Sequence, residues 1–253
     1  MSDNSTSVRA VGVYCRNIDM SYGNKPLFEN LSIDFESGHC TCLLGPSGCG
    51  KSTLLRMISG IKSIAYKGEI VFQEGVSQRE SIAWMSQKDL LLPWLTVIDN
   101  ISLGAKLRGE LTEDVQDKAR QMLVDAGMID YEKQYPSVLS GGMRQRVALL
   151  RTLLEERPVI LMDEPFSALD ALTRLKLQDL SAKLTRGKTV ILVTHDPMEA
   201  LRLGNRIVVL GGSPAGVVAD IKPDGAVPRK SAGSILTKEY PRLLETLMCE
   251  GVA

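Results

Sequence analysis

The sequence predicts an α/β fold in which a core with a mostly parallel β-sheet carries an antiparallel β subdomain and an α-helical subdomain. Three features support this prediction. Apolar runs typical of buried strands alternate with helical patterns before about residue 60 and again after residue 158, which indicates a parallel sheet covered on both faces. Short β-like runs over 11–35, broken at 21–24 and at Lys25 and Pro26, predict antiparallel strands. Residues 97–156 are helical throughout and predict a separate lobe.

The expected elements follow in chain order. Apolar runs bounded by turn residues predict strands at 41–44, 69–72, 82–85, 159–162, 189–193 and 207–210. Apolar residues at helical spacing predict helices at 51–59, 97–107, 113–126, 142–156, 197–203 and 235–248, and Leu177, Leu180 and Leu184 mark another. We therefore expect a disordered tail at 1–10, one domain over 11–221 with the helical lobe inserted in it, and a short C-terminal extension over 222–253.

The composition is that of a globular chain with one large core. Of 253 residues, 44% are hydrophobic, and 30 Lys and Arg balance 30 Asp and Glu, so the basic excess needed for binding nucleic acid or an anionic membrane is missing. The five cysteines form no zinc-like CxxC pair, which indicates free thiols in a reducing cytosol. Cys40 and Cys42 fall on one face of a predicted strand and are expected in the core.

The sequence predicts no membrane passage of its own. Residues 1–12 are polar and lack the apolar region of a signal peptide, and no stretch of about 18 apolar residues could span a bilayer. The best candidate, 90–98, is short and is interrupted by Pro93. If the protein serves a membrane process, we expect another chain to supply the passage.

A glycine-rich segment between a predicted strand and a predicted helix fits the phosphate-binding pattern GxxxxGK[ST]. Its glycines let backbone N–H groups converge on phosphate oxygens, and the helix N-terminus adds free donors and a positive dipole end. Lys51 can reach the β- and γ-phosphates, and the Ser52 hydroxyl can bind Mg²⁺. The alternative is a plain glycine turn. The segment consists of Gly45, Pro46, Ser47, Gly48, Cys49, Gly50, Lys51 and Ser52, followed by Thr53.

Two carboxylates follow the apolar run at 159–162. A buried parallel strand delivers its C-terminal end beside the phosphate site. Asp163 is then placed to hold Mg²⁺, directly or through water, and Glu164 to polarise an attacking water molecule. The alternative is that this Asp-Glu pair caps a helix, as isolated pairs commonly do.

The segment LSGGMRQR at 139–146 decides between kinds of phosphate chemistry. Ser140 and two glycines open a predicted helix, and this second anion-binding N-terminus has no use in a simple P-loop kinase. With this segment, the sequence resembles the ATPase subunit of an ABC transporter over about residues 11–221, with the motifs in the family's order. The resemblance implies ATP and Mg²⁺ as ligands and ATP hydrolysis as the activity.

The resemblance implies that two copies of the chain complete each site. Ser140, Gly141 and Gly142 would bind the γ-phosphate of ATP held by the other copy in a head-to-tail dimer. Asp170 ends the segment 167–170, which resembles the loop that passes between the two sites.

Three more residues match functional positions of the family. Tyr22 matches the aromatic residue that stacks on adenine, and Gln87 the glutamine that contacts Mg²⁺ and the lytic water. His195 matches the histidine that senses the γ-phosphate, although a lone His after a strand commonly has no such role. The expected catalytic set is therefore Glu164, His195, Gln87 and Lys51.

The residues after Gln87 resemble one branch of the family. The run KDLLLPWLTV at 88–97 is similar to importer ATPases of the nitrate, sulfonate, taurine and thiamine-pyrimidine-precursor group, and Met143 agrees with that group. This implies separate integral membrane permease subunits, a separate substrate-binding protein and a peripheral position on the cytoplasmic face of the inner membrane. We expect Leu92 and Trp94 to contact the permease. Core packing is the alternative for Trp94.

Other functions are less compatible with the sequence. An exporter half would carry membrane helices of its own. A soluble ABC ATPase not coupled to transport would usually carry two cassettes or a long coiled-coil insertion, for which the spacer 87–140 is short. A kinase does not need the segment 139–146.

Among the cysteines, we expect Cys49 to be the reactive thiol, because it lies beside a helix N-terminus.

Overall fold

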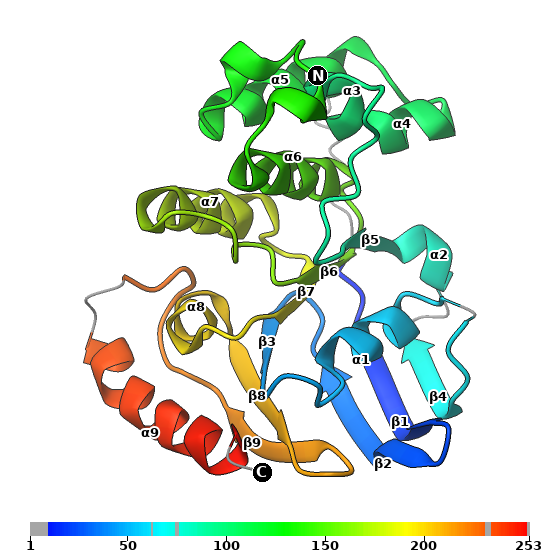
Figure 1. The fold of residues 1–253 in the computed structure, drawn as a ribbon, viewed down its shortest axis with the longest axis vertical. Coiled ribbons are helices and arrows are strands. Elements are labelled where there is room, and N and C mark those ends of the chain that lie inside the picture. Colours follow the sequence, from blue (N-terminus) through cyan, green and yellow to red (C-terminus); the bar gives the residue numbers. More distant parts are fainter. Residues whose placement is uncertain (1–9, 62, 74–75, 231–233, 252–253) are drawn as a thin grey trace, which may run out of the picture.

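The computed structural model describes residues 10–61, 63–73, 76–230 and 234–251, and this part of the chain folds into two β-sheets and several helices (Figure 1). The helices of 97–154 gather at one end of the molecule, and the antiparallel strands lie toward the other. The predicted fold class is confirmed. The tail predicted at 1–10 lies outside the described residues, apart from Ala10. Within the described ranges, no helix combines the length and apolar character needed to cross a membrane.

The smaller sheet is antiparallel and has the order β2-β1-β4, formed by β1 (Val13–Tyr22), β2 (Lys25–Phe35) and β4 (Lys67–Phe72). The turn between β1 and β2 is tight, because Tyr22 pairs with Lys25 and Gly23 has a φ of 59°, which glycine adopts without strain. We expected Lys25 and Pro26 to interrupt the strands, but they begin β2. An edge strand such as β2 tolerates a proline near its start.

The larger sheet has the order β5-β6-β7-β3-β8-β9. Its strands from β5 to β8 are parallel, and β9 pairs antiparallel with β8. The carboxyl ends of the parallel strands therefore meet at one edge, which is where open α/β sheets bind ligands. The bounds are β3 (Cys40–Leu44), β5 (Ile82–Met85), β6 (Val159–Asp163), β7 (Thr189–Val193), β8 (Arg206–Gly211) and β9 (Gly216–Ile221).

Each central parallel strand is buried on both faces, as its continuous apolar run predicts. Alternate residues belong to two apolar clusters. On one face, Cys42 and Met162 pack with residues of the helical end, and on the other, Leu43 and Leu161 pack with α1 (Lys51–Ile58) and the antiparallel sheet. The binding edge of the sheet is thus held between two cores.

The helical end contains α3 (Val97–Ile101), α4 (Leu103–Arg108), α5 (Glu113–Asp125) and α6 (Gly141–Leu154). The prediction of one helix over 97–107 is wrong, because the chain turns at Ser102 (φ −85°, ψ 3°). The turn brings Gly104 against Glu155, where a Cβ would lie 1.5 Å from Oε1. The short helix α2 (Gln78–Ser81) was not predicted.

The remaining helices are α7 (Ala171–Leu184), α8 (Pro197–Leu203) and α9 (Ser234–Gly251). The C-terminal extension packs on the core, since Leu243 of α9 is completely buried in it. Arg229, also buried, ties the extension to α8. Its guanidinium donates to the carbonyl oxygens of Leu201 (2.8 Å), Gly204 (2.7 Å) and Asp224 (2.6 Å).

We predict that Arg229→Met lowers the free energy of unfolding by about 2–4 kcal/mol, because it leaves several buried carbonyl groups without donors. Denaturant unfolding measures this loss. Arg242→Met, which removes an exposed guanidinium from α9, serves as the control and should change stability by less than about 0.5 kcal/mol. Equal effects of the two variants would contradict the prediction.

Candidate active site

The residues predicted to act on a nucleotide gather where the parallel strands end. β3 leads into the phosphate loop and α1, and β6 ends at Asp163. Gln87 follows β5, and His195 follows β7. Because these strands are parallel, their carboxyl ends bring four distant parts of the sequence to one edge.

Two positions of the phosphate loop must be glycine, because neighbouring atoms leave no room there for a side chain. A Cβ at Gly45 would lie 2.1 Å from the carbonyl oxygen of Leu210, and one at Gly50 would lie 2.4 Å from Cζ of Phe28. Both glycines also have positive φ, 144° and 96°. Lys51 is folded into the loop, where Nζ donates to the carbonyl oxygen of Gly45 at 2.7 Å.

A cavity of about 480 Å³ opens over this loop, which is a volume typical of sites for small molecules and cofactors. The plain glycine turn is therefore the weaker interpretation. The predicted residues that line the cavity are Tyr22, Ser47, Gly48, Gly50, Lys51, Ser52, Thr53, Gln87 and Glu164. Gly45, Pro46 and Cys49 belong to the loop but do not line the cavity.

Lys25, Pro26 and Leu27 also line the cavity and were not predicted. The tight turn after Tyr22 brings the start of β2 beside it, and this turn is the sequence signal that could have identified them. The hydroxyl of Tyr22 lies 3.2 Å from Oγ1 of Thr53, within hydrogen-bonding distance, so the aromatic side chain is positioned over α1.

Asp163 does not line the cavity but bonds to Ser52, which does. Ser52 Oγ donates to its Oδ1 at 3.0 Å. Burial raises the pKa of the Asp163 carboxyl, and the hydrogen bond from Ser52 partly opposes this effect. The alternative that Asp163 and Glu164 cap a helix is wrong, because the next helix, α7, begins at Ala171.

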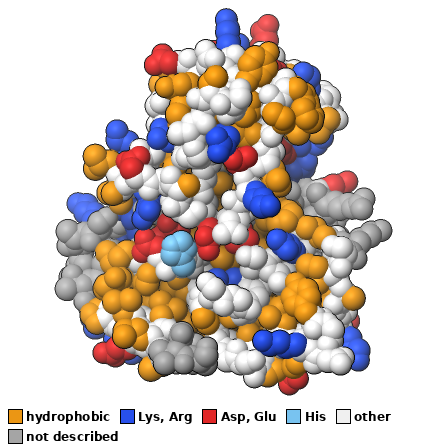
Figure 2. Space-filling view, in the orientation of Figure 1, with side chains coloured by type: hydrophobic (Ala, Val, Ile, Leu, Met, Phe, Trp, Pro, Cys, Tyr) orange, Lys and Arg blue, Asp and Glu red, His pale blue; other side chains and the backbone are white. Residues whose placement is uncertain are grey.

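Glu164 contacts Gln87 and His195, the other two predicted catalytic residues that lie outside the phosphate loop. Nε2 of Gln87 donates to its Oε2 at 3.3 Å, and Nδ1 of His195 lies 3.4 Å from its Oε1. His195 is exposed, whereas Glu164 is partly buried. Figure 2 shows a histidine side chain exposed next to acidic side chains near the middle of this face of the molecule. Solvent can therefore reach the group formed by Glu164, Gln87 and His195 from the side where His195 is exposed.

Ser140, Gly141, Gly142 and Asp170 do not line the cavity. Ser140 caps α6, since its Oγ accepts from the backbone N of Met143 at 3.3 Å, and the N–H groups of a first helical turn have no partner within the helix. Asp170 caps α7, and the hydrogen bond from the backbone N–H of Thr173 lowers the pKa of its carboxyl. The chain therefore has a second glycine-led helix N-terminus, that of α6, outside the cavity.

Comparison with known proteins identifies the family. The ABC transporter family model matches residues 28–167. The chain belongs to the ABC transporter family. An uncharacterized ABC transporter ATP-binding protein of Haemophilus influenzae is 42% identical over 93% of this chain and 98% of its own length. The aliphatic sulfonates import ATP-binding protein SsuB 1 of Rhodococcus jostii is 39% identical over 94% of each chain.

Solved ABC cassettes share the fold. A dimeric post-hydrolysis structure of the ATP-binding cassette MJ0796 bound to ADP and Pi matches with a TM-score of 0.73 at 31% identity, over 85% of this chain and all of that chain. The predicted resemblance and the ATPase activity are therefore confirmed. The interpretation as an importer ATPase is confirmed as well, and a soluble ABC ATPase not coupled to transport is not favoured.

In this ABC subunit, the segment after Gln87 presents Trp94 to solvent. The side chain of Trp94 is 69% exposed, so the core interpretation is wrong. Asn100, which is completely buried, shapes the segment: its Nδ2 donates to the carbonyl oxygens of Leu92 and Leu95, both at 3.1 Å, and its Oδ1 accepts from the N of Leu92 at 2.8 Å. Because Asn100 provides hydrogen-bond partners for these backbone groups, the loop keeps a shape in which the side chain of Trp94 points outward.

The prediction that Cys49 is the reactive thiol is wrong. Only 7% of Cys49 is exposed, and it belongs to the apolar cluster under the phosphate loop. The loop turns on Gly45, and a Cβ there would lie 3.0 Å from the Cys49 sulfur, so the thiol points inward. Cys40 and Cys42 pack in the other cluster, as predicted, whereas Cys249 is exposed.

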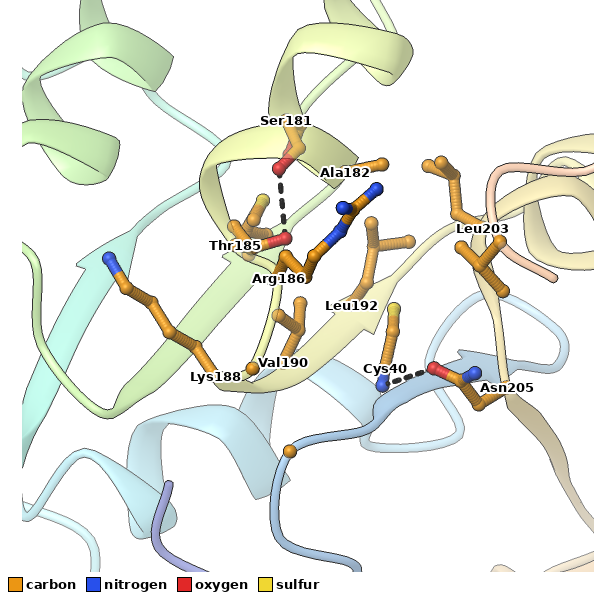
Figure 3. Close-up of a pocket in the computed structure, with 14 residues that line it drawn as sticks. Cys40, Ser181, Ala182, Thr185, Arg186, Lys188, Val190, Leu192, Leu203 and Asn205 are labelled. Atoms are coloured by element: carbon orange, nitrogen blue, oxygen red, sulfur yellow. Dashed lines mark hydrogen bonds between the residues drawn. The ribbon is translucent and has the colours of Figure 1, made fainter. Parts of the chain in front are cut away.

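A second cavity, of about 170 Å³, lies between the end of α7 and the first residues of β3 and β7 (Figure 3). None of the predicted site residues lines it. Two polar groups on its wall already have partners: Thr185 Oγ1 donates to the carbonyl oxygen of Ser181 at 2.8 Å, and Asn205 Oδ1 accepts from the N of Cys40 at 2.9 Å. We assign this cavity no part in ATP hydrolysis.

Proposed function

We propose that two copies of this chain close head-to-tail over two ATP molecules and hydrolyse them to drive import through separate membrane subunits. The observation that supports the dimer is the position of Ser140, Gly141 and Gly142. They open a helix suited to bind an anion, yet they do not line the cavity formed with Lys51. A nucleotide held by another copy would supply that anion, and the MJ0796 cassette to which this chain is similar is dimeric.

Within each proposed site, the phosphate loop holds the nucleotide. The backbone N–H groups of residues 45–51 would bind the phosphates, and Lys51 would exchange a carbonyl partner for a phosphate oxygen. Tyr22 would stack on adenine at the mouth of the cavity. Glu164 would accept a proton from the attacking water, whose oxygen bonds to the γ-phosphorus as the bond to ADP breaks. His195 would contact the γ-phosphate from the open side.

The residues present suit Mg²⁺. The hydroxyl of Ser52, the carboxylate of Asp163 and the amide oxygen of Gln87 are oxygen ligands of the kind that Mg²⁺ prefers, and the first two are already adjacent. In the described ranges, no cluster of His, Cys, Asp and Glu would form a metal site alone, so phosphate oxygens would complete the ligands. Bound Mg²⁺ would neutralise charge on the transferred phosphoryl group.

We predict that Glu164→Gln binds ATP normally but hydrolyses it about 10²–10⁴-fold more slowly, because the amide cannot accept the proton. The variant should accumulate as an ATP-bound dimer, which size-exclusion chromatography with Mg-ATP would detect. Glu36→Gln, which changes an exposed carboxylate paired with Lys222, is the control and should hydrolyse ATP at the wild-type rate. A wholly monomeric Glu164→Gln would contradict the proposed dimer.

We propose that Leu92 and Trp94 bind the permease, with the chain at the cytoplasmic face of the membrane. The exposure of Trp94 supports this, since exposed aromatic side chains commonly anchor interfaces. The segment also begins beside Gln87, which contacts Glu164. A change at the nucleotide would therefore reach the partner within a few residues.

We predict that Trp94→Ala leaves the isolated subunit folded and active but weakens assembly with the permease about thirtyfold and abolishes transport. A truncated hot-spot aromatic costs about 2 kcal/mol or more of binding. Affinity capture of the membrane subunits and uptake by vesicles measure the two effects. Met248→Ala, which shortens an exposed apolar side chain on α9, should change neither. Normal transport by Trp94→Ala would remove this segment from the coupling mechanism.

We infer that the cargo is a small sulfonate delivered by a separate binding protein. Several similar proteins are named aliphatic sulfonates import ATP-binding proteins, at 36–40% identity. We predict that cells lacking this subunit lose ATP-dependent uptake of a labelled alkanesulfonate and regain it with the wild-type chain but not with Glu164→Gln. Full uptake without the subunit would exclude this cargo.

A further inference from the structure

Gln145 is buried near the start of α6, with only 6% of its surface exposed. Its side-chain amide binds the loop that follows β6. Nε2 donates to the carbonyl oxygen of Glu164 at 2.9 Å and to Oγ of Ser167 at 3.2 Å, and Oε1 accepts from the backbone N of Ala168 at 2.8 Å. Both ends of the amide are thus committed to one short segment of backbone.

The backbone that Gln145 holds has a demanding conformation. Glu164 has a φ of +50°, in the left-handed region that residues with a Cβ seldom occupy. Its N–H donates to the carbonyl oxygen of Val193 at 2.9 Å, and Oγ of Ser167 donates to its carbonyl oxygen at 3.1 Å. With Gln145, these bonds fix the peptide groups on both sides of Glu164. They therefore set the direction of the carboxylate toward Gln87 and His195.

The same helix carries the second anion-binding terminus. α6 begins beside Ser140, and Gln145 lies in the next turn. Gly142 approaches the same loop closely, because a Cβ there would lie 2.9 Å from the carbonyl oxygen of Ala168. A shift of this helix end on binding phosphate would therefore be transmitted to the backbone of Glu164.

We propose that Gln145 is a positioning residue for Glu164, through which α6 makes the general base of one site respond to the ATP bound by the other. This inference rests on the proposed function, in which Glu164 is the base and Ser140 acts across the dimer. Gln145 touches no substrate in this scheme. It acts only through the backbone of the carboxylate that does.

The test is a double-mutant cycle with Gln145→Ala and Glu164→Gln. Because small displacements of a catalytic group cost up to about 10²-fold in rate, Gln145→Ala should lower kcat about 10- to 100-fold. Its Kd for a fluorescent ATP analogue should stay within about twofold of wild type. In the double variant, the loss should be no greater than in Glu164→Gln alone, because residues that act as a unit are not additive.

The outcomes separate this inference from the proposal on which it rests. Additive losses in the double variant would overturn the role of Gln145 while leaving Glu164 as the base. Wild-type hydrolysis by Glu164→Gln would overturn both. The dependence of the rate on ATP should also become less cooperative in Gln145→Ala, and an unchanged Hill coefficient would overturn the link between the sites.

Two further variants exclude a merely structural effect. Gln145→Glu keeps the shape and the acceptor for Ala168 but removes the donor to Glu164, so it should lose as much rate as Gln145→Ala. Gln178→Ala removes another buried amide, which bonds Arg202 and Glu199 but neither Glu164 nor its loop, and it should lower stability with kcat within about twofold of wild type. A comparable loss of kcat in Gln178→Ala would overturn the inference.

Discussion

The hydroxyl of Ser52 donates to the carboxylate of Asp163 and so joins the start of α1 to the end of β6. Each residue comes from a different part of the chain, and the bond fixes the distance between the phosphate loop and the two carboxylates. The loop can occupy this position only because Gly45 and Gly50 have no side chains, which would clash with Leu210 and Phe28. Burial of the sheet on both faces keeps this arrangement in place.

α6 connects this site to the rest of the molecule. Its Gln145 holds the backbone of Glu164, and its Arg151 holds the segment after Gln87 by donating to the carbonyl oxygens of Asp89 (2.7 Å) and Leu90 (2.9 Å). A single rigid helix therefore contacts the loop that carries the general base and the segment that leads to Trp94. These contacts provide a physical path between hydrolysis and the proposed permease surface.

Much of the site could be predicted because its parts are contiguous motifs at strand ends. The phosphate loop, Asp163 and Glu164 each follow an apolar run, and a parallel sheet brings such ends together. Features that depend on distant partners could not be predicted. The turn at Ser102 places Gly104 against Glu155, a residue distant in the sequence, and the inward direction of Cys49 depends on how the phosphate loop turns.

The burial of Gln145 is another feature that could not be predicted from the sequence, because it depends on a distant part of the chain. Gln145 lies off the apolar stripe of α6 formed by Met143, Val147, Leu150 and Leu154, so helical periodicity alone gives no reason to expect it to be buried. Its burial arises from the loop that folds over the first turn of the helix. This contact exists only once the fold has brought the loop after β6 against α6.

The exposure of Trp94 gives the molecule a built-in optical reporter. The chain has two tryptophans, and the other, Trp84, lies on β5 and packs partly against an apolar cluster. The emission of an indole in water lies at longer wavelengths than that of an indole in an apolar environment. Fluorescence of the free subunit therefore contains a solvent-exposed component from Trp94, and a partner that covers this side chain would shift that component to shorter wavelengths without any added label.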